Sequence, residues 1–204
     1  MSTLRKHPSS VAAPSVGRPR SQQAHQAILQ AAGDLLERNG FAAVTMKAIA
    51  ARAGVSKATI YRRWPNKAAI ITEGFLEQIA PKIKFMEAGS VQESVRLQMH
   101  LLAKLFAGKR GRVIAALVGE AQNDATVSRA FLKHWIAVRR HDTRQVLALG
   151  IARGELRPDL DLDVAMDALY GPIYYRLLVR HLPLSEAFVD KLAEHVLHGI
   201  AHSP

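Results

Sequence analysis

Residues 45–64 read TMKAIAARAGVSKATIYRRW, and this stretch decides the fold of the first part of the chain. Thr45 is a suitable N-cap for a short helix with an apolar inner face, and Gly54 allows the tight turn that ends it. Ser56 can cap a following helix at about 57–63, which buries one apolar side chain and leaves polar ones exposed. The stretch therefore predicts two short helices joined by a glycine turn.

Two further helices flank this pair. Apolar residues recur every three or four positions from Ser21 onward, which predicts a helix that stops at Gly40. After a proline break, Asn66 is expected to cap a helix that continues to Pro81. We call residues 21–67 the head.

Beyond Pro81 the sequence contains no alternating strand pattern, and Gly, Pro and Asn-Asp breaks divide it into helical stretches. The whole chain is therefore predicted to be all-α with about nine helices. A disordered basic tail is expected at 1–20, the head at 21–67 and a helical body at 68–204. The helices of the body are expected at about 90–107, 112–122, 126–152, 161–181 and 185–201.

The formal net charge of +11 is concentrated in the first third of the chain. Residues 1–70 contain eleven Lys and Arg against two acidic residues, whereas the remainder contains seventeen against fifteen. This asymmetry indicates that the first third faces a polyanion. A basic surface that merely keeps the protein in solution is the alternative.

Composition also disfavours several classes of protein. No stretch approaches the run of about 18 uncharged apolar residues that a membrane span requires. There is no cysteine, and Ser and Pro follow Arg5 and Lys6 where a signal peptide needs an apolar segment. We therefore expect a cytoplasmic protein without a membrane partner, and the sequence indicates no cofactor.

The segment AGVSKATIYRRWPNK at residues 53–67 resembles the DNA-binding domain of Tet repressor (TetR) family regulators, and the resemblance extends from Gln22 to about Ile79. The segments at 156–159 (LRPD) and 171–176 (GPIYYR) resemble the C-terminal domain of some members. The resemblance implies a homodimer that binds a palindromic operator in double-stranded DNA. It further implies a repressor that a small hydrophobic effector releases from that operator.

The resemblance places the DNA contacts on the head, where the second helix of the pair fits a major groove. Three neighbouring positions are expected to read bases, namely Lys57, Ala58 and Thr59. Phosphate contacts are expected from Thr45, Tyr61, Arg63 and Lys67. Arg18 and Arg20 are expected to enter a minor groove, unless they belong to a tail that is merely disordered. Trp64, before a proline and beside an apolar helix, is expected to pack in the core.

Bulky or adaptable residues of the middle helices are candidates to line an effector cavity, with ordinary core packing as the alternative for each. They are Phe75, Met86, Met99, Leu102, Phe106, Phe131, Trp135, Tyr170 and Tyr174.

The resemblance implies that the last two helices pair with those of a second subunit. The apolar residues expected at that interface are Ala168, Ile173, Leu177, Phe188, Leu192, Val196 and Ile200, and some residues of these helices must instead fill the subunit's own core.

Other chemistry is weakly indicated. His195, His198 and His202 share a helical face, but no cysteine or obvious carboxylate completes a metal site, so none is predicted. The aspartates at 159, 161 and 163 lack the glycine and distal glutamate of a calcium loop, and helix capping explains them better.

No Ser-His-Asp order, P-loop or dinucleotide fingerprint is present, so an enzyme is not expected. Two alternatives to the regulator remain open. One is a helical enzyme or small-molecule-binding protein with a basic head, and the other is a non-specific nucleoid or scaffold protein.

Overall fold

The computed structural model describes residues 17–79, 83, 85, 86 and 88–200, and it is helical with no strand among them. The helices are α1 (Gly17–Ala43), α2 (Met46–Ala53), α3 (Lys57–Tyr61), α4 (Lys67–Ile79), α5 (Val91–Ala107), α6 (Lys109–Ala121), α7 (Ala125–Phe131), a π-helical segment (Leu132–Ile136), α8 (Ala137–Ala152), α9 (Leu162–Val179) and α10 (Glu186–Ile200). Because α7, the π-helical segment and α8 follow one another without a break, the described residues form nine continuous helices, which confirms the all-α prediction.

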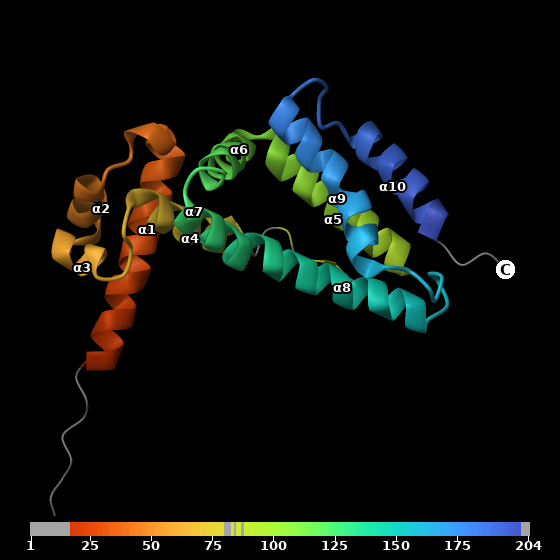
Figure 1. The fold of residues 1–204 in the computed structure, drawn as a ribbon, viewed down its shortest axis with the longest axis horizontal. Helices are drawn as coiled ribbons and strands as arrows, with labels where there is room; N and C mark the ends of the chain where they lie inside the picture. The colour runs from red at the N-terminus through yellow and green to blue at the C-terminus, as the bar shows by residue number, and fades with distance from the viewer. Residues whose placement is uncertain (1–16, 80–82, 84, 87, 201–204) are drawn as a thin grey trace, which may run out of the picture.

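The head stands at one end of the molecule, with α2 and α3 on one side of α1 and α4 on the other (Figure 1). Its helix starts follow the predicted caps. The hydroxyl of Thr45 accepts from the Ala48 amide at 3.1 Å, Ser56 accepts from the Thr59 amide at 3.2 Å, and Asn66 accepts from the Ala69 amide at 2.9 Å. These side chains satisfy amides that a helix start otherwise leaves without partners.

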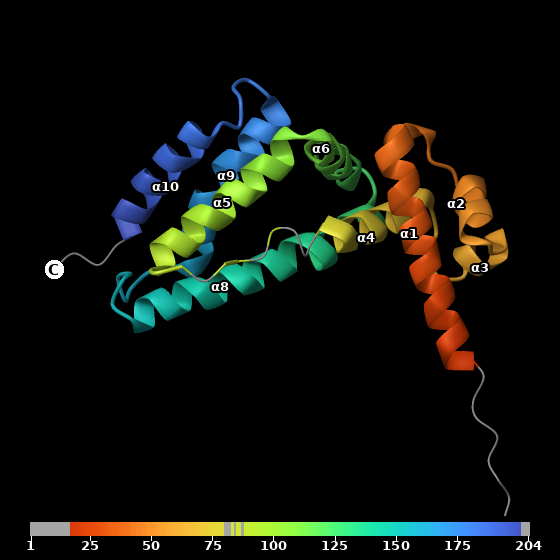
Figure 2. The same cartoon turned by 180° about the vertical axis from the view of Figure 1, so that it is seen from behind.

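The body is a bundle in which α5 packs against α8, α9 and α10, as Figure 2 shows from behind. The short helices α6 and α7 connect this bundle to α1 and α4. One apolar core runs from the head into the body, and Ile49, Ile60, Phe75, Met99 and Trp135 are fully buried in it. None of the described helices combines the length and apolar character that crossing a membrane requires.

Two helix starts differ from the prediction. Helix α1 begins at Gly17 instead of Ser21, so Arg18 and Arg20 lie on a helix and not in the expected tail; the rest of that tail lies outside the described residues. A proline in its first turn is compatible with this start. The break predicted at about 108–111 is only a cap, because α6 already begins at Lys109.

Two other features of the helices concern their interiors. The predicted stop at Gly40 is confirmed, since this residue has a left-handed φ of 75° that interrupts the helical backbone. The π-helical segment, by contrast, lies inside the stretch 126–152 for which one regular helix was predicted. Helical periodicity does not distinguish α from a single π turn.

Candidate nucleic-acid interface and effector cavity

Helices α2 and α3 form a helix-turn-helix held by a left-handed glycine. Gly54 has φ 66° and ψ 32°, and the Val55 amide donates to the Ala50 carbonyl at 3.1 Å. Ile49 and Ile60 are fully buried, so both helices are fixed against α1 through their apolar faces. The opposite face of α3 is thereby presented outward.

The outward face of α3 carries most of the predicted base-reading and phosphate residues. Lys57, Ala58 and Arg63 are exposed, and Tyr61 is 54% exposed, which is unusual for a large aromatic side chain. Thr59 is half-buried, and its hydroxyl lies 3.0 Å from that of Ser56. The exposed hydroxyl, ammonium and guanidinium groups suit an anionic partner.

Trp64 anchors the end of α3 in the core, as predicted. It is 4% exposed, its indole N–H donates to Glu73 at 2.8 Å, and its ring stacks on His25 with 5.2 Å between centroids. The guanidinium of Arg63 lies 5.6 Å from the same ring centroid. Trp64 therefore joins α1, α3 and α4 and fixes the place of the exposed arginine.

Lys67 and Thr45 are placed differently with respect to a phosphate. The Lys67 ammonium donates to the Phe41 carbonyl at 3.2 Å and lies 5.2 Å from the Phe41 ring centroid, and its side chain is half-buried, so its phosphate contact stays a prediction. Thr45 is exposed at the start of α2, and its hydroxyl proton remains available while its oxygen caps the helix.

An ion pair that joins α1 to α2 was not predicted from the sequence. Arg52 donates to Asp34 at 2.5 Å, and this hydrogen bond is the main cause that holds the pKa of Asp34 below its usual value. The two residues are 18 positions apart, so no helical spacing could indicate their contact.

A cavity of about 440 Å³ lies in the body, bordered by α5, by the run from α7 to α8 and by α9. Four of the predicted effector residues line it, namely Leu102, Phe131, Tyr170 and Tyr174. Trp135 is buried beside it and donates to the Tyr174 hydroxyl at 2.5 Å, and the Phe106 ring packs edge-on against Tyr174. Met99 is buried in the core, whereas Met86 is 49% exposed before α5 and does not line the cavity.

Polar side chains that the sequence analysis passed over also line this cavity. They are Gln98, Arg139, Arg140, Thr143 and Asp167. Gln98 is only 3% exposed and Thr143 only 2%, so each lies in the apolar stripe of its helix. A polar residue within an apolar helical stripe is unusual, and this signal in the sequence could have identified Gln98 and Thr143 as candidate cavity residues.

Burial dominates the electrostatics of the cavity. It raises the pKa of Tyr174 to about 12 and that of Tyr170 further still, with Thr143 offsetting part of the latter shift. The Tyr170 hydroxyl makes no well-aligned hydrogen bond with a described residue. Burial also lowers the pKa of Arg139, whose guanidinium lies 4.1 Å from the Trp135 ring centroid.

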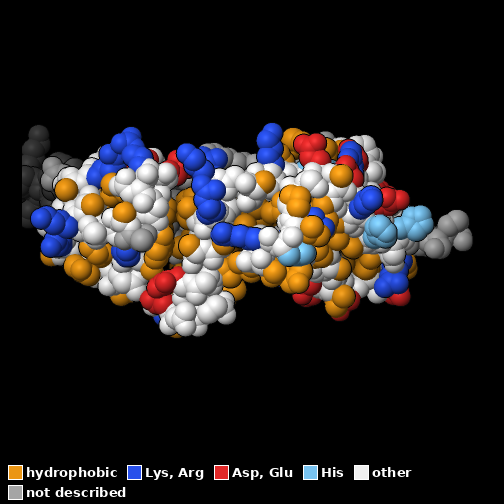
Figure 3. All heavy atoms as spheres, turned by 90° about the horizontal axis from the view of Figure 1, so that it is seen from above, with side chains coloured by type: hydrophobic (Ala, Val, Ile, Leu, Met, Phe, Trp, Pro, Cys, Tyr) orange, Lys and Arg blue, Asp and Glu red, His pale blue; other side chains and the backbone are white. Residues whose placement is uncertain are grey.

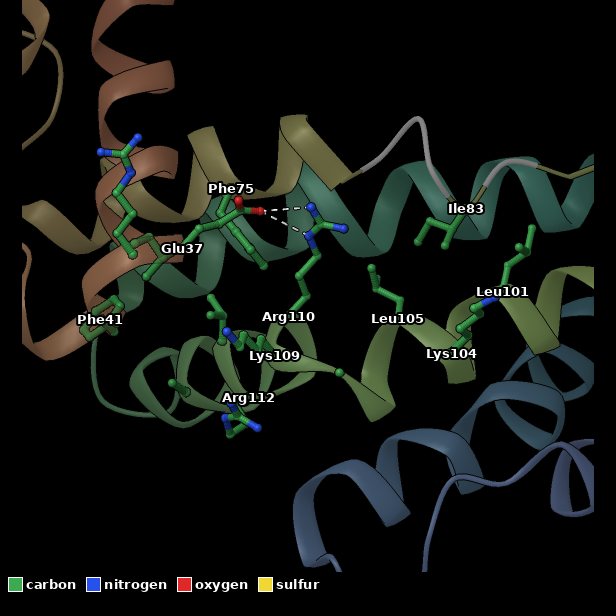
Figure 4. Close-up of a pocket in the computed structure, with 16 residues that line it drawn as sticks. Glu37, Phe41, Phe75, Ile83, Leu101, Lys104, Leu105, Lys109, Arg110 and Arg112 are labelled. Carbon is green, nitrogen blue, oxygen red and sulfur yellow. Dashed lines mark hydrogen bonds and ion pairs between the residues drawn. The ribbon is translucent and has the colours of Figure 1, made fainter.

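A second, open groove of about 910 Å³ separates the head from the body (Figure 4). Phe75 lines its floor together with apolar residues of α5 and α6. Across it, the Arg110 guanidinium donates to Glu37 at 3.0 and 3.2 Å, which connects α6 to α1.

The predicted dimer residues fall into two groups. Ile173 is fully buried, and Leu177 and Ile200 are 5% and 8% exposed, so these three fill the subunit's own core. Ala168 is exposed, and Phe188, Leu192 and Val196 are half-buried.

Helix α9 also bears an exposed apolar stripe, because its exposed large side chains recur at helical spacing. They are Val164 (64%), Tyr175 (58%), Leu178 (44%) and Val179 (53%). Viewed from above, Lys and Arg side chains lie over the head and over the middle of the molecule, and apolar side chains are spread over both ends (Figure 3).

The histidines and aspartates considered for metals have structural contacts. His195 lies 2.5 Å from the Lys191 carbonyl, and His202 lies outside the described residues. Asp161 caps α9 by accepting from two amides, as predicted. A different group, His25, Glu73 and Glu77, brings its ligand atoms within 4.8 Å of one another, but Glu73 is already held by Trp64.

Comparison with known proteins relates both parts of the chain to one group. Residues 28–73 match the model for bacterial regulatory proteins of the tetR family, and residues 85–196 match that for a tetracyclin repressor-like C-terminal domain. The Bacillus subtilis protein YdeS, an uncharacterized HTH-type transcriptional regulator, is 39% identical over 90% of this chain and 93% of its own.

Two further comparisons agree. A DNA-binding transcriptional repressor TetR from Mycobacteroides abscessus is 27% identical over 87% of this chain and 94% of its own. The crystal structure of the TetR family transcription regulator SCO0332 superposes with a TM-score of 0.80 at 32% identity, covering 89% of this chain and all of that one.

Proposed function

Because the chain belongs to the tetR family of DNA-binding transcriptional regulators, we propose that it is a homodimeric repressor whose two heads read a palindromic operator. The observation that carries the proposal is the exposed surface of α3 and of the turn after it, where Lys57, Tyr61 and Arg63 are exposed while Ile49 and Ile60 are buried. A surface of this shape and charge fits a major groove.

The roles of the head residues follow from their chemistry and exposure. Lys57 can donate to guanine, and the Ala58 methyl can contact a thymine methyl. Tyr61, Arg63 and the capping Thr45 donate to phosphates, which set the register of the head on the duplex. Arg18 and Arg20, on the first turns of α1, are proposed to contact the adjacent backbone or minor groove.

The exposed stripe on α9 is proposed as the centre of the two-fold interface. Val164, Ala168, Tyr175 and Leu178 lie at successive turns of one helical face, and water contact with them is unfavourable. The half-buried apolar residues of α10 extend this surface. Two-fold pairing of the bodies would give the pair of heads that a palindrome requires.

The 440 Å³ cavity is proposed to bind the effector, since its size falls within the range of small-molecule sites. Its wall includes α8 and α9, and α6 links the bundle to the head through Arg110 and Glu37. A ligand that prefers one arrangement of these helices shifts the spacing of the heads, and DNA weakens ligand binding by the same factor.

The test is selection of bound duplexes from random DNA by the wild-type protein, Lys57→Ala and Thr59→Ala. We expect the wild type to enrich one near-palindrome and the variants to relax it at the matching bases in both halves. Arg153→Ala, a change at the exposed residue that follows the end of α8, is the matched control and should enrich the wild-type sequence. Enrichment of no palindrome by the wild type contradicts the proposal.

A further inference from the structure

The effector cavity is apolar over most of its wall but contains a small set of buried polar groups. Leu102, Val118, Phe131, Ile136 and Met166 supply the apolar part. Gln98, Arg139, Thr143, Tyr170 and Tyr174 supply the polar part. Pockets of this kind use a few polar groups to select and orient one class of ligand.

Gln98 is the clearest sign that something polar belongs in the cavity. It is 97% removed from solvent, and its Oε1 has no hydrogen-bond partner among the described residues. A buried acceptor without a partner is costly, and native proteins rarely keep one without a reason. A ligand with an N–H or O–H group would satisfy it.

Arg139, Thr143, Tyr170 and Tyr174 can each donate a hydrogen bond, whereas the Asp167 carboxylate at the cavity wall can only accept. The Tyr174 oxygen already accepts from Trp135, so its own proton is left to donate into the cavity. The Tyr170 hydroxyl is buried without a well-aligned partner, and the Thr143 hydroxyl is buried close to it. These donors converge on the side of the cavity where Arg139 lies.

Arg139 adds a fixed positive charge to this side. Its guanidinium is stacked on Trp135 with 4.1 Å between the Cζ atom and the ring centroid, which holds the planar group in one orientation. The acidic Asp167 at the cavity wall is bound instead to Arg140 and is largely exposed. Arg139 therefore brings a cationic group with five N–H donors to this side of the cavity, more than a single contact can use.

From this arrangement we infer that the effector is an amphipathic organic acid. Its apolar body lies against the aliphatic and aromatic wall, its carboxylate accepts from Arg139 and the tyrosine hydroxyls, and a hydroxyl or amide N–H donates to Gln98 Oε1. The inference rests on the proposed effector role of the cavity and narrows it to one chemical class. Neutral hydrocarbons leave the donors unsatisfied, and cations are repelled by Arg139.

The test compares an alcohol, an acid and a hydroxy acid in each of two series, which differ in the apolar part of the ligand. Decanol, decanoate and β-hydroxydecanoate form the alkyl series, and naphthol, naphthoate and hydroxynaphthoate form the aromatic one. Binding is measured on the full-length protein without DNA, by calorimetry and by intrinsic tryptophan fluorescence, to which Trp135 beside the cavity and Trp64 in the head both contribute. We expect either the alkyl or the aromatic series to bind. Within that series the acid should bind about tenfold or more tighter than the alcohol, and the hydroxy acid should bind tighter still.

Variants assign these preferences to residues. Arg139→Leu should remove the advantage of the acid over the alcohol, Arg139→Lys should keep part of it, and Gln98→Leu should remove the advantage of the hydroxy acid. Arg129→Leu, an exposed change on α7 outside the cavity wall, is the control and should change neither. Circular dichroism verifies that each variant is folded.

Several results overturn the inference. They are alcohols that bind the wild type as tightly as the acids, no binding by either series, or an acid preference that survives in a folded Arg139→Leu. Release of DNA is measured separately by fluorescence anisotropy. Binding of an acid that leaves DNA affinity unchanged would refute the effector role while the ligand class stands.

Discussion

At the scale of single residues, Lys57 and Tyr61 are proposed to have different tasks, Lys57 in reading bases and Tyr61 in contacting phosphates. Base-edge contacts discriminate sequences, whereas phosphate contacts bind all sequences alike. We predict that Tyr61→Phe weakens binding to operator and to random duplex equally, by about 2- to 10-fold for one lost hydrogen bond.

Lys57→Ala should instead weaken operator binding by about 5- to 100-fold and random duplex much less. Fluorescence anisotropy at one salt concentration measures, for each duplex, the ratio of the variant's dissociation constant to that of the wild type. Equal losses on operator and random DNA for Lys57→Ala would assign this lysine to phosphate contact alone.

Asp34 and Arg52 fix α2 to α1, and their hydrogen bond gives the head a specific acid sensitivity. Because the folded-state pKa of Asp34 is lowered, its stabilising effect is complete above the ordinary value of 3.8 and is lost as pH falls through the folded-state pKa. Since the pair is about one-third exposed, the contribution is small, about 0.5 kcal/mol.

We predict that Asp34→Asn lowers the unfolding free energy by about this amount at pH 7 and by nothing in strong acid. Urea unfolding at both pH values measures it, with Glu120→Gln, an exposed change without an ion pair among the described residues, as control. A loss that persists unchanged in acid would show that packing, not charge, is responsible.

Residue-level prediction from sequence succeeded where the physics is local. The caps Thr45, Ser56 and Asn66 each accept from the amide three positions ahead, so the sequence order contains the whole interaction. The placement of Lys67 on Phe41 depends on how α4 packs beside α1, which no local pattern reports.

Among the helices, the crossing of α1 and α4 depends on a glycine. A Cβ at Gly74 would lie 2.6 Å from the Leu29 carbonyl oxygen, so only glycine permits this approach of the two backbones. We predict that Gly74→Ala destabilises the protein by about 1–3 kcal/mol, because overpacking exceeds the gain in helix propensity of about 1 kcal/mol.

Gly119→Ala on α6 is the matched control, since a Cβ there meets nothing within 4 Å. It should be neutral or stabilising by up to about 1 kcal/mol. Thermal and urea unfolding compare the two variants. If Gly74→Ala were as stable as Gly119→Ala, the close crossing of α1 and α4 would be wrong.

A glycine predicted a helix boundary correctly where it ends a helix and does not also cap the next one. Gly40 ends the regular part of α1 as predicted, but Gly108 caps α6 and so the helix starts earlier than the Gly-rich segment suggested. In α9, apolar residues occur on every side, and this uniformity hides which face is internal. In the structure Ile173 is buried and marks the internal face of α9, whereas Leu178 is 44% exposed and marks the outer face.

For the whole molecule, the exposed stripe on α9 is the proposed centre of the two-fold interface. We predict that the double variant Tyr175→Glu, Leu178→Glu is monomeric, because two buried charges on each subunit oppose pairing. Its affinity for a complete palindrome should fall toward that for a half-site, since one head then binds alone. Sedimentation and anisotropy measure the two effects.

Leu149→Glu places the same charge on an exposed apolar residue of α8 and should remain dimeric with unchanged DNA affinity. A folded double variant that stays dimeric would place the interface elsewhere. A wild-type protein that sediments as a monomer would remove the basis for a two-head complex.

The charge division along the chain predicts a basic head, and the head lies at one end of the molecule (Figure 1). It could not predict the cavity, because Gln98, Arg139 and Tyr170 come from three different helical stretches. Their convergence is a property of the packed bundle and not of any local pattern.

The central claim is that an exposed, correctly packed helix-turn-helix reads a specific sequence. The most direct test is the ratio of affinities for the selected palindrome and for a scrambled duplex of equal length, at one physiological salt concentration. The account predicts a ratio of about a thousandfold or more. Equal affinities that fall together with added salt would contradict it and would indicate a basic protein that binds DNA without reading it.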